Sequence, residues 1–270
     1  MPEIPLIIEI DADDQQCTIV FVDAFVADQT YRFILDTGAS RTQVVADDYI
    51  NTLEKVGEHR SRGVFALSSQ RTVLLPNIAI GPLESGAIVA SVAPRSESMH
   101  PLIGMDLLYR HRLHFLFDRE VLVIDETPLG YVFNSLALDD ANHLYLEARW
   151  PTATASCVWD SGAGMSIVDE AFWSTNRNLF TTIEDSIGVD ASGAQRSSTT
   201  YEVSDMTIGG RRFAPHHVAV VDLSSANSTL DTPMDMILGY PTLRQYNWFF
   251  DVPQRLWSIT ERDNMSLNVD

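Results

Sequence analysis

The chain has 270 residues, of which 45% are hydrophobic and 20% charged, so it can form one large domain or two lobes and is not wholly disordered. Asp and Glu number 37 against 18 Lys and Arg, which gives a formal net charge of −19. A surface this acidic repels phosphate groups, which argues against nucleic-acid binding and against docking on an anionic membrane.

In chain order, short alternating or β-branched runs predict strands in both halves of the sequence. The predicted strands are Ile4–Ile10, Cys17–Phe25, Thr30–Leu35, Ile88–Val92, Val121–Ile124, Leu144–Ala148, Cys157–Trp159, His217–Val221 and Leu256–Ile259. Brief helices are predicted at Ala46–Leu53, at Glu170–Trp173, and near Met105 and Pro241. Polar loops are predicted at Glu58–Arg62, Ser96–His100, Ser174–Asn178 and Ser224–Asp231. We therefore expect an all-β protein with a few short helices.

The sequence offers few signs of secretion, of metal binding or of membrane insertion. The first ten residues lack a basic segment followed by a long apolar one, and no run approaches the roughly 20 apolar residues of a membrane span. Cys17 and Cys157 are too few for a disulfide scaffold or a zinc site, and we expect both to be small buried hydrophobes. The expected location is cytoplasmic, unless a leader has been removed.

Landmarks in the first half of the chain recur in the same order in the second half. The repeated segments are Asp36-Thr37-Gly38-Ala39 with Asp160-Ser161-Gly162-Ala163, Ile80-Gly81 with Ile208-Gly209, Leu102-Ile103-Gly104 with Ile237-Leu238-Gly239, and Phe117-Asp118 with Phe250-Asp251. Such conserved order within one chain predicts a duplicated unit with approximate twofold symmetry. We predict an N-terminal lobe over residues 1–127 and a C-terminal lobe over 128–270, divided near the breaker cluster at Thr127–Gly130.

The two Asp motifs carry the chemistry. Each follows an apolar strand, so twofold symmetry would bring Asp36 and Asp160 face to face. Two carboxyl groups in contact share one proton, and the pair then holds an acid and a base at once, as in an aspartic-protease dyad. The hydroxyls of Thr37 and Ser161 can hydrogen-bond to the backbone of the opposite loop and lock the two loops together. Gly38 and Gly162 permit a tight turn and the close approach of a second backbone or of substrate.

These motifs resemble those of the two-lobed aspartic peptidases of the pepsin/retropepsin superfamily. Asp36 to Ser40 is similar to the retropepsin-like form, and the Ile/Leu-Gly pairs are similar to the landmark behind the family's catalytic loops. The resemblance implies a bilobal pepsin-like acid-protease fold and an aspartic endopeptidase in which Asp36 and Asp160 activate water. Thr37, Ser161, Gly38, Gly162, Ala39 and Ala163 would support the active-site loops. It implies a peptide or protein substrate, no cofactor and no metal.

The sequence departs from pepsins at the segments that would cover the substrate. Each half offers a Gly-started segment, Gly63–Arg71 and Gly188–Arg196, and we expect two flaps, one from each lobe. The candidate flap contacts with substrate are Val64, Phe65, Ala66, Val189 and Asp190. Phe65 is either the aromatic residue of a flap tip or a packing residue within its hairpin.

Ala39 and Ala163 stand where pepsins usually carry a hydroxyl that hydrogen-bonds the neighbouring Asp. Without that hydroxyl the ionised carboxylates lose a stabilising partner, so we expect apparent pKa values for the pair above those of pepsin. The acidity of the whole chain acts in the same direction. The expected activity optimum is mildly acidic to neutral.

Two alternatives to a monomeric peptidase stay open. One is a non-catalytic peptide-binding module on the same fold, and the other is an obligate homodimer whose lobes pair between chains; we expect a monomer. Asp47-Asp48 and Asp139-Asp140 are expected on solvated faces, and Gly209-Gly210 in a hairpin turn. The seven histidines lack the carboxylate or cysteine spacing of a metal site.

Overall fold

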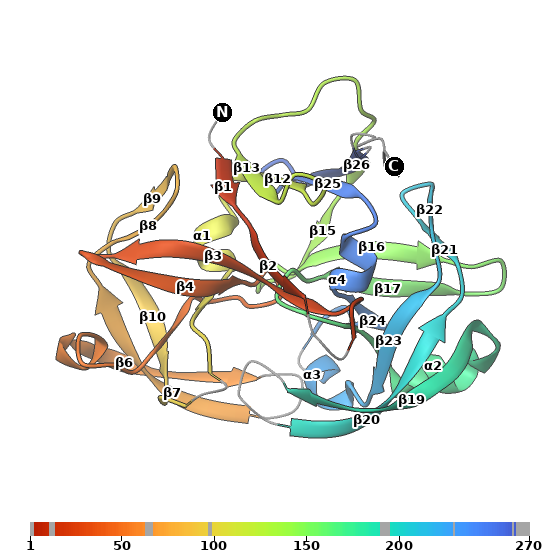
Figure 1. The fold of residues 1–270 in the computed structure, drawn as a ribbon, viewed down its shortest axis with the longest axis horizontal. Helices are drawn as coiled ribbons and strands as arrows, with labels where there is room; N and C mark the ends of the chain where they lie inside the picture. Colours follow the sequence, from red (N-terminus) through yellow and green to blue (C-terminus); the bar gives the residue numbers. More distant parts are fainter. Residues whose placement is uncertain are drawn as a thin grey trace, which may run out of the picture.

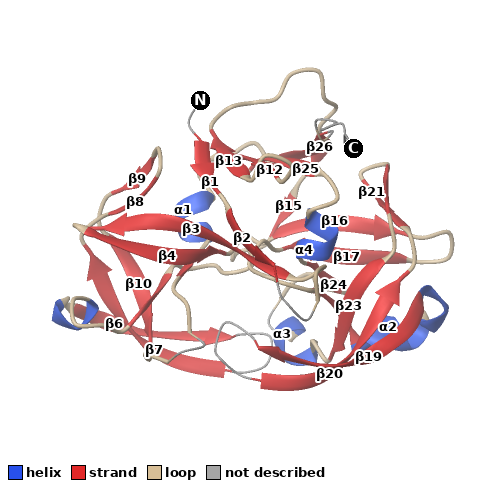
Figure 2. Ribbon diagram, viewed as in Figure 1, coloured by secondary structure: helices blue, strands red, loops and turns tan. Residues whose placement is uncertain are grey.

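A computed structural model describes residues 3–10, 14–62, 67–96, 99–189, 195–228, 230–260 and 262. Strands dominate it, and two curled half-barrel sheets confirm the prediction of a bilobal all-β fold (Figures 1 and 2). Within the described residues, no helix is both long and apolar enough to cross a membrane.

The first lobe is built on a sheet in which ten strands are described. Their order is β6 (Lys55–Arg62), β7 (Leu67–Leu75), β10 (Ile88–Ala93), β5 (Gln43–Val45), β11 (Leu102–Ile103), β4 (Gln29–Leu35), β3 (Thr18–Val26), β8 (Ile78–Ile80) and β9 (Leu83–Ser85), with β2 (Ile7–Ile10) also on β3. Parallel pairing of β11 with β4 brings the Leu102-Ile103-Gly104 landmark beside the strand that leads to Asp36.

The second lobe repeats this order strand for strand. It runs β19 (Phe180–Val189), β20 (Gln195–Val203), β23 (His216–Val221), β18 (Ser166–Asp169), β24 (Met236–Leu238), β17 (Thr154–Trp159), β16 (Leu144–Arg149), β21 (Met206–Ile208) and β22 (Arg211–Phe213), with β15 (Ala137–Leu138) on β16. Since both the strand order and the parallel pair β17–β24 are repeated, the duplication read from the sequence is a duplication of the fold.

A third sheet joins the two lobes. Its described strands run β1 (Glu3–Pro5), β13 (Val121–Ile124), β12 (Arg112–Leu116), β25 (Asn247–Asp251), β26 (Leu256–Thr260) and β14 (Asn134–Ser135). β12 of the first half pairs with β25 of the second, and the aromatic rings of Phe115, Trp159, Trp248 and Phe250 pack together there. These four side chains are fully buried, so the junction between the lobes is part of the core.

The helices are short. They are α1 (Met105–Leu108), α2 (Glu170–Thr175), α3 (Ser224–Asn227) and α4 (Tyr240–Leu243), with 3₁₀ turns η1 (Ile50–Thr52) and η2 (Arg177–Leu179). α1 and α4 begin directly after the landmark glycines, as predicted near Met105 and Pro241. The Gly209-Gly210 turn between β21 and β22 is confirmed, with φ of 56° and 79°, as a type I′ hairpin requires.

Several local predictions are wrong, each for a physical reason. The helix expected over Ala46–Leu53 is only the turn η1: the Asp47 carboxylate caps its start by accepting the Ile50 N–H at 2.6 Å, and the backbone is already extended at Leu53. Glu58–Arg62 is not a loop but most of β6, held by its ladder to β7. The strand expected over Ile4–Ile10 breaks at Leu6, which is buried and bonds to Glu120 O at 2.8 Å.

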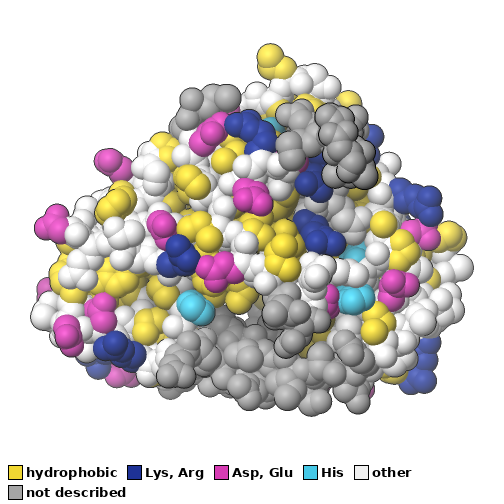
Figure 3. Space-filling view, in the orientation of Figure 1, with side chains coloured by type: hydrophobic (Ala, Val, Ile, Leu, Met, Phe, Trp, Pro, Cys, Tyr) yellow, Lys and Arg dark blue, Asp and Glu magenta, His cyan; other side chains and the backbone are white. Residues whose placement is uncertain are grey.

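The remaining local predictions have simple outcomes. Cys17 and Cys157 are both buried, as expected, and no disulfide joins them. The loop expected over Ser224–Asp231 begins with α3. On the face in Figure 3, acidic side chains are scattered among uncharged and hydrophobic ones and do not gather in a single patch.

Candidate active site

The two Asp motifs occupy equivalent turns at the ends of β4 and β17. Asp36 N donates to Ile103 O, and Asp160 N donates to Leu238 O, each at 3.0 Å. Behind each turn, the residue after the landmark glycine donates to the alanine of the motif, Met105 N to Ala39 O at 2.8 Å and Tyr240 N to Ala163 O at 2.9 Å. Each landmark therefore fixes the loop in front of it by the same pair of backbone bonds.

A symmetrical set of hydrogen bonds joins the two loops through their hydroxyls. Thr37 Oγ1 donates to Trp159 O at 3.0 Å and accepts from Ser161 N at 3.1 Å. In the opposite sense, Ser161 Oγ donates to Leu35 O at 2.6 Å and accepts from Thr37 N at 3.2 Å. Both side chains are buried, so these bonds form away from competing water. The lock predicted from the sequence is therefore present.

Gly38 and Gly162 let the carboxyl groups approach the opposite loop. A Cβ at Gly162 would lie 2.5 Å from Asp36 Cγ, and one at Gly38 would overlap the Asp160 carboxylate. Gly38 N instead donates to Asp160 Oδ1 at 3.2 Å, and Gly162 N donates to the same oxygen at 2.8 Å. Any side chain at either position would separate the two carboxyl groups, which explains why both motifs carry glycine there.

Each carboxyl group lies against the glycine of the opposite loop, Asp36 against Gly162 and Asp160 against Gly38, and Asp36 is buried while Asp160 is partly exposed. Burial, and then the negative charge of Asp160, raise the pKa of Asp36 well above its usual range. Burial also raises the pKa of Asp160, but the Gly162 N–H, the charge of His143 and the Gly38 N–H oppose that rise. Backbone N–H groups of Ala39 and Gly38 oppose the rise at Asp36 in the same way, so the pKa of each carboxyl group is raised and the pair shares a proton.

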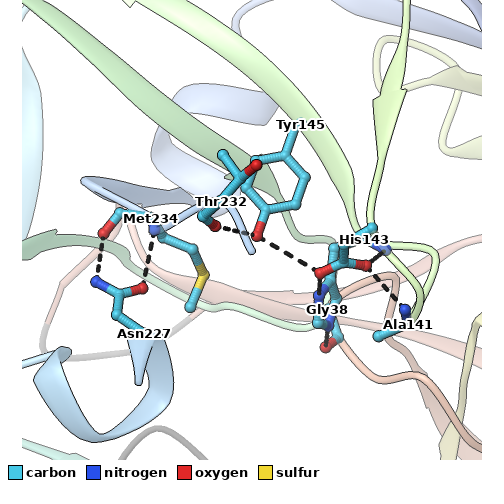
Figure 4. Close-up of polar contacts among 8 residues, drawn as sticks. Gly38, Ala141, His143, Tyr145, Asn227, Thr232 and Met234 are labelled. Atoms are coloured by element: carbon cyan, nitrogen blue, oxygen red, sulfur yellow. Dashed lines mark hydrogen bonds and ion pairs between the residues drawn. The ribbon is translucent and has the colours of Figure 1, made fainter. Parts of the chain in front are cut away.

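His143 is a member of this site that the sequence analysis did not select. Its Nε2 lies 3.0 Å from Gly38 O, and its Nδ1 lies 2.7 Å from Asp139 Oδ2 (Figure 4). The expectation that Asp139 lies on a solvated face is wrong, because its side chain is only 9% exposed. Asp140 is exposed as expected. The Asp-x-x-x-His spacing before β16 is the one sequence signal that could have drawn attention to the pair.

Tyr145 lies next to the Asp139 carboxylate and also bonds to the loop that carries Thr232, which Asn227 holds in place. Tyr145 Oη donates to Thr232 O at 2.9 Å and lies 3.5 Å from Asp139 Oδ2. Asn227 holds the loop that carries Thr232, with its side chain bonded to both the N–H and the carbonyl of Met234 (Figure 4). Asp139 thus has fixed neighbours from two parts of the second lobe.

The described parts of the two predicted flap segments lie on antiparallel strand pairs, β6–β7 and β19–β20, one in each lobe (Figure 1). Each packs in the same way, β7 against β10 and β20 against β23. Val64, Phe65, Ala66 and Asp190 lie outside the described residues. Val189 is the last residue of β19 and pairs with Gln195. The two-flap arrangement stays a prediction.

Comparison with known protein families shows that part of this chain is similar to aspartyl proteases. Residues 22–107 match a protein-family model described as aspartyl protease. The matched span runs from β3 to α1 and contains Asp36 with its hydroxyl and glycine neighbours. No curated protein matches the chain.

Proposed function

We propose that this protein is an aspartic endopeptidase in which Asp36 and Asp160 activate a water molecule to hydrolyse a peptide bond. The observation that carries the proposal is the geometry of two carboxyl groups, one from each duplicated half, that each lie against the motif glycine of the opposite loop while the Thr37 and Ser161 hydroxyls lock the two loops together. The family match over residues 22–107 supports the same chemistry.

We assign the base role to Asp160, whose Oδ1 accepts the N–H groups of Gly38 and Gly162, and the acid role to Asp36. Ionised Asp160 takes a proton from water, whose oxygen bonds to the carbonyl carbon, while protonated Asp36 donates to the carbonyl oxygen. The resulting tetrahedral diol then loses the C–N bond as Asp160 returns its proton to the leaving nitrogen and a diol hydroxyl returns one to Asp36. The products are a carboxylic acid and an amine, and the pair regains its initial protonation.

The substrate class follows from the two hairpins and from the lack of bulk at the motif glycines. An extended peptide can add to the edges of β-hairpins through its main chain while alternate side chains enter pockets. The proposed flap contacts remain Val64, Phe65, Ala66, Val189 and Asp190. Gly38 and Gly162 would face the peptide backbone close to the reacting carbonyl.

A single chain supplies both carboxyl groups, so the proposed site needs no second copy. We propose lobes over 1–127 and 128–270 and a monomer as the active form. A solution mass equal to two chains at the concentration used for cleavage assays would contradict the proposed monomer.

The function is tested with a diverse peptide library incubated in H₂¹⁸O and read by mass spectrometry. We expect internal cleavage, one ¹⁸O atom in each new carboxyl group, and inhibition by a statine-type transition-state analogue. Water attacks directly in this mechanism, so an acyl-enzyme intermediate should never accumulate. Binding of library peptides without cleavage at any pH would favour the non-catalytic peptide-binding module and overturn the proposal.

The pH dependence of kcat/KM is expected to be bell-shaped with a mildly acidic to neutral maximum. The rate falls at low pH as the pair takes up a second proton and at high pH as it loses the shared proton. Because the pKa of each group is raised, both limbs lie at higher pH than for ordinary aspartates. A pH–rate profile measured on a cleaved library peptide checks this, and a maximum below about pH 3 would contradict it.

A further inference from the structure

The two halves of the site are alike in their hydroxyls and glycines but differ in a residue near the start of the strand that pairs with the strand leading to each Asp. In the second lobe Leu144 pairs with Trp159, the residue before Asp160. In the first lobe Phe21 pairs with Ile34, so the next step of the register sets Val20 opposite Leu35, the residue before Asp36. His143, directly before Leu144, therefore corresponds to Ile19, whose aliphatic side chain can neither donate a proton nor carry charge.

The contacts of His143 determine its protonation. Nδ1 faces the Asp139 carboxylate and Nε2 faces the Gly38 carbonyl oxygen, and both of these groups accept hydrogen bonds in this arrangement. Asp139 Oδ1 already accepts from the N–H groups of Ala141 and His143 at 3.0 and 2.9 Å, which favours the ionised carboxylate. Only the imidazolium form has an N–H at each ring nitrogen, so it alone satisfies both contacts.

The electrostatic surroundings agree with this assignment. Burial alone would lower the pKa of His143, but the hydrogen bond and charge of Asp139, then the Gly38 carbonyl and the charge of Asp160, raise it overall. Burial alone would raise the pKa of Asp139, but its bond to His143 and the backbone N–H groups lower it. The titratable groups facing His143 are thus Asp139 and Asp160, with Tyr145 beyond Asp139.

Gly38 connects this pair to the dyad. Its carbonyl oxygen accepts from His143, and its N–H donates to Asp160 Oδ1, so both polar groups of the same residue are fixed. His143 belongs to the second lobe and Gly38 to the first, so the contact also sets the first loop against the carboxylate of the second.

We propose that His143, held charged and oriented by Asp139, is a positioning residue that breaks the symmetry of the dyad by keeping the negative charge on Asp160 and the proton on Asp36. The inference rests on the proposed function for its catalytic consequence, since it assigns Asp160 as the base. Its electrostatic content concerns the resting protein and does not require turnover.

The test combines a direct measurement of charge with a variant. In wild-type protein, ¹⁵N NMR of the His143 ring should show protons on both nitrogens at neutral pH. His143→Gln keeps an N–H donor but removes the charge, so ¹³C NMR should report an Asp160 carboxyl that titrates about one pH unit higher. The acidic limb of kcat/KM should move upward by a similar amount, whereas a merely structural role would lower the whole profile without moving the limb.

The matched control is His111→Gln, which removes a histidine from another His–Asp pair, His111 Nδ1 with Asp125 Oδ2 at 2.9 Å. That variant should leave the Asp160 titration and the acidic limb unchanged. A neutral wild-type His143 ring at pH 7 would overturn the inference even if His143→Gln failed to fold, and so would an unshifted Asp160 in the folded variant. Wild-type protein that cleaves nothing but still shows both NMR signatures would overturn the proposed function alone.

Discussion

Replacing Asp36 or Asp160 by Asn is expected to lower kcat/KM by about 10³-fold or more, while each protein stays folded. Asn fills the space of Asp but cannot exchange a proton, and the proposed reaction uses each carboxyl group as both acid and base. Because the two groups act as a unit, the double variant should lose little more activity than either single one. Initial rates on a library-derived peptide, measured across pH, check the prediction.

Asp48→Asn is the matched control, because Asp48 is exposed and lies outside the site. It should keep wild-type kcat/KM. Either dyad variant cleaving at more than about a tenth of the wild-type rate, with contaminating peptidases excluded by the statine-type inhibitor, would contradict the assignment of that residue.

The same Asp36→Asn substitution that lowers activity is expected to leave the stability of the protein unchanged or to raise it. The pKa of Asp36 is raised in the folded state, so between the ordinary value of 3.8 and the raised value the folded protein binds more protons than the unfolded chain. The free energy of unfolding therefore falls as pH rises through that window. Asp36→Asn removes the effect, and we expect its unfolding midpoint at neutral pH to equal or exceed that of the wild type. An unfolding midpoint below that of the wild type would mean that the variant loses activity because its folding is damaged.

The parts of the fold that could be predicted from the sequence are those that short, repeated sequence patterns determine. Leu35 ends an apolar strand before Asp36, Trp159 does the same before Asp160, and the landmark glycines follow at matched places. These signals predicted two equivalent turns, and the paired strands then bring them together. The hydroxyl lock could be predicted because Thr37 and Ser161 are small polar residues next to the candidate dyad.

Features that depend on distant contacts were missed. The sequence of β6 predicts a polar loop because it lacks apolar alternation, and the strand is instead held by its hydrogen-bonded pairing with β7. Asp139 reads as a surface residue beside Asp140, since only the folded chain brings His143 to Gly38, 105 positions earlier in sequence. The asymmetry between Ile19 and His143 likewise needs the strand registers, which no local pattern specifies.

Thr37→Val and Ser161→Ala are each expected to reduce the free energy of unfolding by about 2–4 kcal/mol. Thr37→Val leaves Trp159 O and Ser161 N without their buried partner, and Ser161→Ala does the same to Leu35 O and Thr37 N. The two oxygens lie 3.5 Å apart and lock the same pair of loops, so the double variant should lose less than the sum of the single losses. Urea unfolding of the four proteins measures this coupling.

The control for the lock is Thr207→Val, which removes an exposed hydroxyl bonded to a backbone carbonyl, Thr207 Oγ1 to Arg149 O at 3.3 Å. Water can replace that bond and valine suits a strand, so the change should stay within about 0.5 kcal/mol. If Thr37→Val were equally mild, the hydroxyl lock could not be what holds the two turns in register. Activity separates the two roles further, because a shift of about 1 Å between the carboxyl groups is enough to lower kcat about 10²-fold. Loss of kcat in the folded fraction of Thr37→Val would therefore tie the geometry of the dyad to the lock beneath it.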